Sequence, residues 1–177
     1  MPVSAPRLET ERLILRQFDS DDLAAHSATL ADPKVMHFLG GNGLSVEDSW
    51  RRMATGVGLW ALTGIGMWAV ERKADQRFVG HLGFFDMHRE IEPSLAGEPE
   101  MGWIFDSAVH GHGIAREACQ AALYWADAHL SGQAIPAIID PDNFASIKLA
   151  EKLGFEREPD ALYKGAPIAL FRRPARR

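Results

Sequence analysis

The chain has little cysteine, no surplus of positive charge and no long apolar run. Only Cys119 is a cysteine among the 177 residues, which excludes an intrachain disulfide and fits a reducing compartment. The formal net charge is −5, whereas nucleic-acid-binding domains usually carry a basic surplus. No segment has the length of a membrane span, and the first residues contain no apolar signal-peptide core. We therefore expect a cytoplasmic protein that binds neither nucleic acid nor membranes.

The composition and length are those of an ordinary globular protein. Apolar residues make up 46 % and charged residues 24 % of the sequence, and no repeat or linker interrupts it. One domain over residues 1–177 is the expected organisation. Cys119 lies among alanines in an apolar helical segment, so we expect a packed thiol rather than a catalytic one. The basic run at 172–177 is expected to be a solvated end.

Hydrophobic periodicity and turn residues predict an α+β fold with a mixed sheet, because several strands follow one another without a helix between them. Glycines at positions 80 and 83 either weaken the predicted strand or let another segment approach its backbone closely. A polar loop is expected at 89–100. The predicted helices begin near Asp21, after Ser45, at Ile114 and at Asn143. The predicted strands are 12–18, 66–72, 77–86, 100–106, 134–140 and 167–173.

The segment VHGHGIAREA, at 109–118, joins a strand to a mostly apolar helix. The first amides of a helix have no partner within the helix and carry partial positive charge. Gly111 and Gly113 let the backbone adopt left-handed angles and let an anion come close. Arg116 adds a full charge, so the loop is a candidate pyrophosphate site. The alternatives are a bare structural turn and a metal site on His110 and His112, but the metal site lacks further ligands nearby in the sequence.

Two motifs resemble those of the GNAT superfamily, the acetyl-CoA-dependent N-acetyltransferases. The first is the pyrophosphate-binding motif Gln/Arg-x-x-Gly-x-Gly/Ala, matched here from His110 to Ala115, although His110 departs from the usual first residue. The second is an Asn-x-x-Ala/Ser-x-x-Leu-x-x-x-x-Gly-Phe signature, matched from Asn143 to Phe155. The segment ETERLILRQFDSDDL resembles the opening of the RimJ/RimL type. The resemblance covers about Leu8 to Phe171.

The resemblance implies a GNAT-like, mostly antiparallel mixed sheet flanked by helices and splayed between its fourth and fifth strands. Those strands would be Glu100–Phe105 and Ala137–Ile139. It also implies acetyl-CoA as co-substrate and no metal. The pantetheine arm would pair with the fourth strand and the pyrophosphate would lie on the loop amides. The implied donor-binding residues are Ile104, Phe105, His110, Gly111, His112, Gly113, Ile114, Ala115, Arg116, Asn143 and Ser146.

Direct transfer of an acetyl group to an amine needs a base, because an ammonium has no lone pair. Glu100 is the candidate, with a strand-end carboxylate in solvent as the alternative. His81 is the second choice, against a satisfied or exposed strand histidine. The tyrosine that many relatives use to protonate the thiolate is replaced by Ala150. Ser146 is the substitute donor, unless its hydroxyl bonds its own helix backbone.

The sequence says least about the acceptor of the acetyl group. The resemblance implies a primary amine, on a protein N-terminus such as that of a ribosomal protein or on a small molecule. Acidic residues at 90, 92, 98 and 100 suit a cation, although such clusters are usually only solvated. The aromatic residues at 60, 68, 84, 85 and 103 are either an acceptor pocket or, more commonly, core. The competing hypothesis is a non-catalytic acyl-CoA-binding sensor or partner module. A homodimer fits the family.

Overall fold

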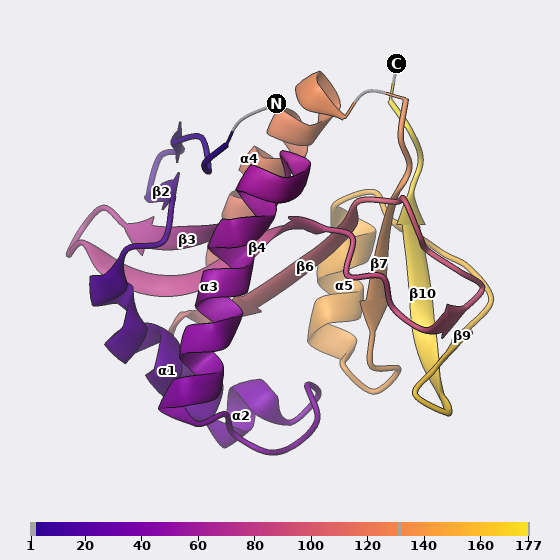
Figure 1. Cartoon of the computed structure of the whole chain (residues 1–177), viewed down its shortest axis with the longest axis horizontal. Coiled ribbons are helices and arrows are strands. Elements are labelled where there is room, and N and C mark those ends of the chain that lie inside the picture. The colour runs from indigo at the N-terminus through magenta and orange to yellow at the C-terminus, as the bar shows by residue number, and fades with distance from the viewer. Residues whose placement is uncertain (1–2, 131, 177) are drawn as a thin grey trace. The chain divides into compact units, whose positions relative to one another are not determined.

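The chain folds into the expected α+β architecture, with antiparallel sheets and helices (Figure 1). The computed structural model describes residues 3–130 and 132–176. Their contacts divide into two compact units. One extends to Gly83 and resumes over Trp103–Ala122, and the other comprises Phe84–Gly102 and the chain from Leu123 onward. A single domain over residues 1–177 stays a prediction.

The first sheet contains the N-terminal strands in the order β1-β2-β3-β4-β6, and the pairs β1–β2, β2–β3 and β3–β4 are antiparallel. Residues 73–76 form the turn between β3 and β4. Because β6 ends the order, one of its edges is not paired within this sheet. The bounds are β1 (Leu8–Glu9), β2 (Leu13–Arg16), β3 (Met67–Arg72), β4 (Arg77–Phe85) and β6 (Glu100–Phe105).

The second sheet has the order β5-β9-β10-β7, and β8 pairs with β10. The predicted fourth and fifth strands correspond to β6 and β7 and belong to different sheets, so the expected interruption between them is confirmed. The expected polar loop is wrong in part, because it contains β5. The bounds are β5 (Ile91–Glu92), β7 (Ile135–Ile139), β8 (Glu156–Arg157), β9 (Ala161–Tyr163) and β10 (Ala166–Arg173).

The predicted helices begin at or near the expected residues, whereas the short helix at 33–36 was not predicted. The Ser45 hydroxyl accepts a hydrogen bond from the Asp48 amide at 3.0 Å, and Gly64 ends this helix in a left-handed conformation. No helix in the described part of the chain is long and apolar enough to span a bilayer. The α-helices are α1 (Leu23–Ala31), α2 (Pro33–Met36), α3 (Val46–Thr63), α4 (Ile114–His129) and α5 (Phe144–Lys152), with short 3₁₀ turns at Ser20–Asp22 and Ser107–Val109.

Gly80 and Gly83 allow close approaches, one of the two roles expected of them. A Cβ on Gly80 would lie 2.5 Å from the Ile104 carbonyl oxygen, and its φ of +154° is unfavourable for other residues. A Cβ on Gly83 would collide with the Gly66 carbonyl oxygen. The ladder between β3 and β4 also shifts register at Val70. Glycine therefore lets β4 pack tightly against both of its neighbours.

Four of the five candidate aromatic side chains form core rather than an open pocket, whereas Trp103 is only half-buried. Trp60 and Trp68 are completely buried and stack edge to face with ring centroids 4.6 Å apart, and Phe84 and Phe85 are also buried. Each tryptophan indole donates to a backbone carbonyl, at Met67 and Pro6 respectively. Their main role is packing, as the more common interpretation of such a pattern predicted.

Cys119 and Arg173 are both buried. Cys119 is fully buried, and burial raises the pKa of its thiol, which confirms a packed rather than reactive cysteine. The expectation of a solvated C-terminal run is wrong for Arg173, which is 4 % exposed and forms two hydrogen bonds with Asp127 at 2.7 and 2.8 Å. Arg177 lies outside the described residues.

Candidate active site

The loop before α4 has the backbone that its glycines predicted. Gly111 and Gly113 have φ angles of +78° and +76°, in the left-handed region that favours glycine. A Cβ on Gly111 would meet no atom within 4 Å. The loop is therefore open around Gly111, and its glycines are required by conformation rather than by crowding.

The amides at the start of α4 are available to an anion. The first helical hydrogen bond runs from the Glu117 amide to the Gly113 carbonyl at 3.1 Å. Among the described residues, the amides of Gly113, Ile114, Ala115 and Arg116 make no hydrogen bond to a protein group. The Arg116 side chain is exposed and forms no ion pair with another described residue. Free amides, the helix dipole and one uncompensated cation together fit a diphosphate.

Each histidine of the loop takes part in a hydrogen bond, His110 through its ring and His112 through its backbone. The His110 Nε2 atom is 3.0 Å from the Phe105 carbonyl oxygen, so this nitrogen carries the proton and donates. The His112 carbonyl accepts a hydrogen bond from Arg12 at 3.0 Å. The described residues contain no group of three or more histidine, cysteine, aspartate or glutamate side chains arranged for a metal ion.

Of the two β6 residues expected to bind the donor, Ile104 and Phe105, only Phe105 turns its backbone toward the unpaired edge of the strand. The Asp106 amide donates to the Val79 carbonyl on β4 at 3.0 Å. In an antiparallel ladder alternate residues face the same neighbour, so Ile104 also faces β4 and Phe105 faces the unpaired edge. The Phe105 carbonyl already accepts from His110. A ligand that pairs with this edge at Phe105 would therefore use its amide first.

The predicted base, Glu100, is buried and paired. Its side chain is 5 % exposed, so the alternative of a carboxylate in solvent is wrong. Arg89 donates from Nε and Nη2 to the two carboxylate oxygens at 2.7 and 3.1 Å, and its Nη1 donates to the Tyr163 hydroxyl at 2.9 Å. Burial raises the pKa of Glu100 and outweighs the opposing effect of Arg89. Glu100 thus combines a raised pKa with a fixed orientation.

His81 is neither the hydrogen-bonded nor the solvent-exposed strand histidine expected from the sequence as alternatives to a base. It is 2 % exposed, and neither ring nitrogen has a hydrogen-bond partner among the described residues, so it is neither satisfied nor exposed. Burial, and then the nearby His26 and Arg52, hold the pKa of His81 well below its usual range. Because the charged form is so disfavoured, His81 is a poor proton acceptor.

The second signature begins at the cap of α5. The Asn143 side chain accepts a hydrogen bond from the Ser146 amide at 3.1 Å, so Asn143 caps its helix as one of its two predicted roles requires. Ser146 lies in the first turn and is partly buried. Ala150 is completely buried, so the position that holds a tyrosine in many relatives is packed here. The part of Ser146 in catalysis stays a prediction.

Sequence reasoning missed the partners of two acidic residues. Arg89 and Tyr163 orient Glu100, and Thr10 and Arg12 bind Glu117. The only sequence signal for such partners is indirect, since a glutamate in an apolar segment needs a donor when it is buried. The residue that donates the hydrogen bond comes from a segment distant in the sequence, so no local pattern predicts the pair.

The chain was compared with known proteins. Residues 12–156 match the profile of the acetyltransferase (GNAT) domain. The uncharacterized N-acetyltransferase YoaA of Bacillus subtilis is 29 % identical over 157 residues, which cover 86 % of this chain and 84 % of YoaA.

Solved structures show the same fold. An acetyltransferase from Agrobacterium tumefaciens superposes with a TM-score of 0.82 at 25 % identity, over 96 % of this chain and 94 % of the other. RimL, the ribosomal L7/L12 α-N-protein acetyltransferase, superposes in its complex with coenzyme A with a TM-score of 0.75 at 17 % identity, over 96 % and 98 %. The likeness to RimL concerns the fold alone.

Proposed function

Because the chain belongs to the acetyltransferase (GNAT) family, we propose that it transfers the acetyl group of acetyl-CoA directly to a primary amine. The acceptor is either the α-amine of a protein N-terminus, such as that of a ribosomal protein, or a small amine. The observation that carries the proposal is the row of free amides from Gly113 to Arg116 behind an exposed arginine. A diphosphate is the ligand that such a helix start binds best.

The donor would be bound mainly by backbone. The loop amides would take the diphosphate, with the Arg116 side chain adding a full charge. The Phe105 amide at the open edge of β6 would pair with the pantetheine arm. The remaining proposed donor-binding residues are His110, Gly111, His112, Ile114, Ala115, Asn143 and Ser146. The other predicted strand residue, Ile104, turns its backbone toward β4 and is not assigned a hydrogen bond to the donor.

Glu100 would act as the base. Acetyl-CoA supplies an acetyl group on a thiol that leaves as a thiolate. Glu100 takes the proton that the ammonium must lose before it can attack. The neutral amine nitrogen then forms its bond to the acetyl carbon, the carbon–sulfur bond breaks, and the second proton of the nitrogen goes to the departing thiolate. Its raised pKa favours this transfer near neutral pH. Arg89 keeps the carboxylate oriented, and one of the two oxygens that accept from Arg89 must also accept the proton. Ser146 would donate a hydrogen bond to the thiolate, in place of the tyrosine that Ala150 replaces.

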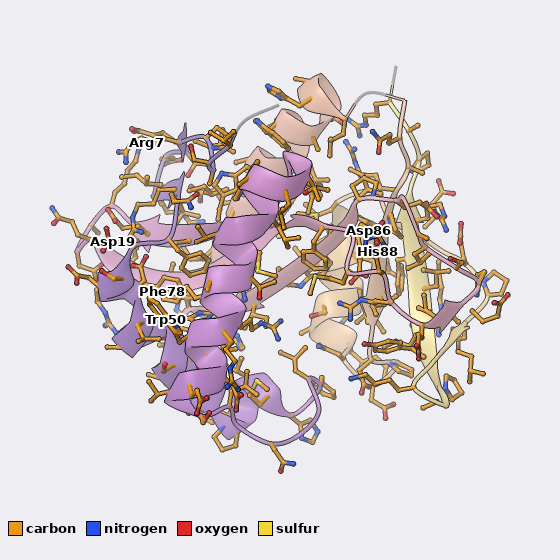
Figure 2. The ribbon with its side chains drawn as sticks, viewed as in Figure 1. Arg7, Asp19, Trp50, Phe78, Asp86 and His88 are labelled. Atoms are coloured by element: carbon orange, nitrogen blue, oxygen red, sulfur yellow. The ribbon has the colours of Figure 1, made fainter. Side chains whose placement is uncertain are left out.

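The charge of the second unit supports a cationic acceptor. Glu90 and Glu92 are exposed and form no ion pair with another described residue. Asp86 lies beside His88 (Figure 2) and accepts hydrogen bonds from the His88 and Gly97 amides at 2.8 and 2.7 Å. The resulting negative potential attracts an ammonium group before it loses its proton. A free α-amine at a protein N-terminus and a small polyamine both have this chemistry.

The release of free thiol from acetyl-CoA, measured with a panel of small amines and N-terminal peptides, tests the proposal. We expect turnover with at least one class of primary amine, and mass spectrometry should find the acetyl group on its nitrogen. Binding of acetyl-CoA without turnover across the panel would instead support the non-catalytic module. A chain that does not bind coenzyme A at all would contradict both hypotheses.

A further inference from the structure

The N-terminal segment is bound to the first turn of α4 by several hydrogen bonds to one carboxylate. The Thr10 hydroxyl and the Arg12 amide donate to Oε1 of Glu117 at 2.6 and 2.9 Å. The Arg12 Nε donates to Oε2 at 2.6 Å. Burial raises the pKa of Glu117, but the hydrogen bonds from Thr10 and Arg12 outweigh it and hold the pKa below its usual range. The carboxylate is therefore ionised at neutral pH, and it fixes the Arg12 guanidinium in place.

The same guanidinium extends to the glycine loop. The Arg12 Nη1 donates to the His112 carbonyl oxygen at 3.0 Å. The remaining nitrogen, Nη2, would lie 3.5 Å from a Cβ on Gly113. One planar group thus connects Glu117 in the helix to the peptide that joins His112 and Gly113.

The contact between Arg12 and the His112 carbonyl determines the direction in which the Gly113 amide points. The peptide between His112 and Gly113 is not among the cis bonds of the described chain, and in a trans peptide the C=O and N–H groups point in opposite directions. With the His112 carbonyl held toward Arg12, the Gly113 amide is directed away from the guanidinium. Without that contact, a loop with glycines at 111 and 113 has many backbone conformations of similar energy.

We propose that Arg12 is a positioning residue for the anion-binding loop, which holds the His112–Gly113 peptide so that the amides at the start of α4 are ready for a diphosphate. The inference rests on the proposed function for its ligand, whereas the contact itself does not depend on it. Fixing the loop before binding removes part of the ordering cost that the ligand would otherwise bear. Arg12 acts through the backbone of the loop and is not assigned a contact with the donor.

The matched control comes from the same surface. Arg12 and Arg72 both line a cavity of about 230 Å³ beside the loop, together with Ala108, Val109, His112 and Ile114. Arg72 forms its ion pair with Asp75, at 2.9 and 2.6 Å, rather than with the loop. Arg72→Met removes the same charge from the same cavity wall as Arg12→Met, but only the latter frees the His112 carbonyl.

The experiment measures the dissociation constant of coenzyme A by calorimetry and the backbone amide signals of the unliganded protein by NMR. We expect Arg12→Met to raise the dissociation constant about tenfold or more and to shift the Gly111 and Gly113 signals. Arg72→Met should change affinity less than about twofold and leave both signals in place. Arg12→Lys keeps the charge but has one nitrogen for two acceptors, so it should recover little of the affinity.

Unchanged affinity in Arg12→Met would overturn the inference, and so would complete recovery in Arg12→Lys, which would show that charge alone matters. If Arg12→Met does not fold, Glu117→Gln releases the guanidinium and should produce the same loss of affinity and the same signal shifts. Failure of the wild-type protein to bind coenzyme A would contradict the proposed function instead, and the two glycine signals would still decide whether Arg12 positions the loop.

Discussion

At the scale of single residues, the proposed chemistry depends on how burial and an ion-pair partner together act on the Glu100 side chain. Glu100 is buried, which raises its pKa, and Arg89 limits the rise while fixing both carboxylate oxygens. A carboxylate in water would keep the ordinary pKa of a glutamate, and its side chain would rotate freely. The sequence identified Glu100 by its place at the start of an apolar strand, but Arg89 and Tyr163 came only from the structure.

Glu100→Gln should lower kcat by about a hundredfold, because the amide keeps the size of the side chain but cannot accept the proton. In the wild-type protein, kcat/KM should fall as the pH drops through the raised pKa of Glu100, and this limb should vanish in the variant. Steady-state kinetics across pH measures both effects. Glu151→Gln, at an exposed position of α5, is the control. Equal activity of Glu100→Gln and wild type would remove Glu100 from the mechanism.

His26 and His81 should make folding sensitive to acid. Their rings lie 4.8 Å apart, and no ring nitrogen of either has a hydrogen-bond partner among the described residues. Burial and the nearby charge of Arg52 lower the pKa of His26 to about 4, although Asp22 acts in the opposite direction. The pKa of a histidine in the unfolded chain is near 6.5. Between these values the unfolded chain binds more protons than the folded one, so stability falls as the pH drops through this window.

Chemical denaturation at a series of pH values measures this loss. The free energy of unfolding should decrease by about 3 kcal/mol for His26 between pH 6.5 and 4, with His81 adding in the same direction. In the double variant His26→Leu, His81→Leu the decrease should be much smaller. The rings also pack against Phe18 and Phe78, so the variant tests the slope against pH rather than the absolute stability. An identical slope in both proteins would be incompatible with neutral buried histidines.

At the scale of elements, the start of α4 is the part of the fold that binds the donor in this account. Gly111→Ala forces a side chain into the left-handed region and should cost about 1–2 kcal/mol of stability. Gly165→Ala is the matched control, because Gly165 has a φ of +79° and equally open surroundings. Both variants should lose similar stability in thermal melts, but only Gly111→Ala should bind coenzyme A more weakly. An equal loss of binding in both would show that strain alone, and not the loop, lowers the affinity.

At the scale of the whole molecule, the sequence predicted the long, strongly patterned elements and missed the short ones. The helices capped by Ser45 and Asn143 follow from local chemistry. The strands β5 and β8 have only two residues each and pair with partners distant in the sequence. The strand β9 has three residues, so none of the three is long enough to show a local period. The same reason explains why the loop at Gly111 was predicted from its glycines, whereas the contact of Arg12 with His112 was not.

The whole account depends on coenzyme A being bound through its diphosphate by the backbone at the start of α4. Calorimetric titration of the wild-type protein with coenzyme A and with pantetheine, which has the same thiol arm but no diphosphate, tests this directly. We predict that coenzyme A binds at least about a hundredfold more tightly, because charge-assisted hydrogen bonds to several amides are lost with pantetheine. Equal affinity for the two ligands, or no heat with coenzyme A, would contradict the account.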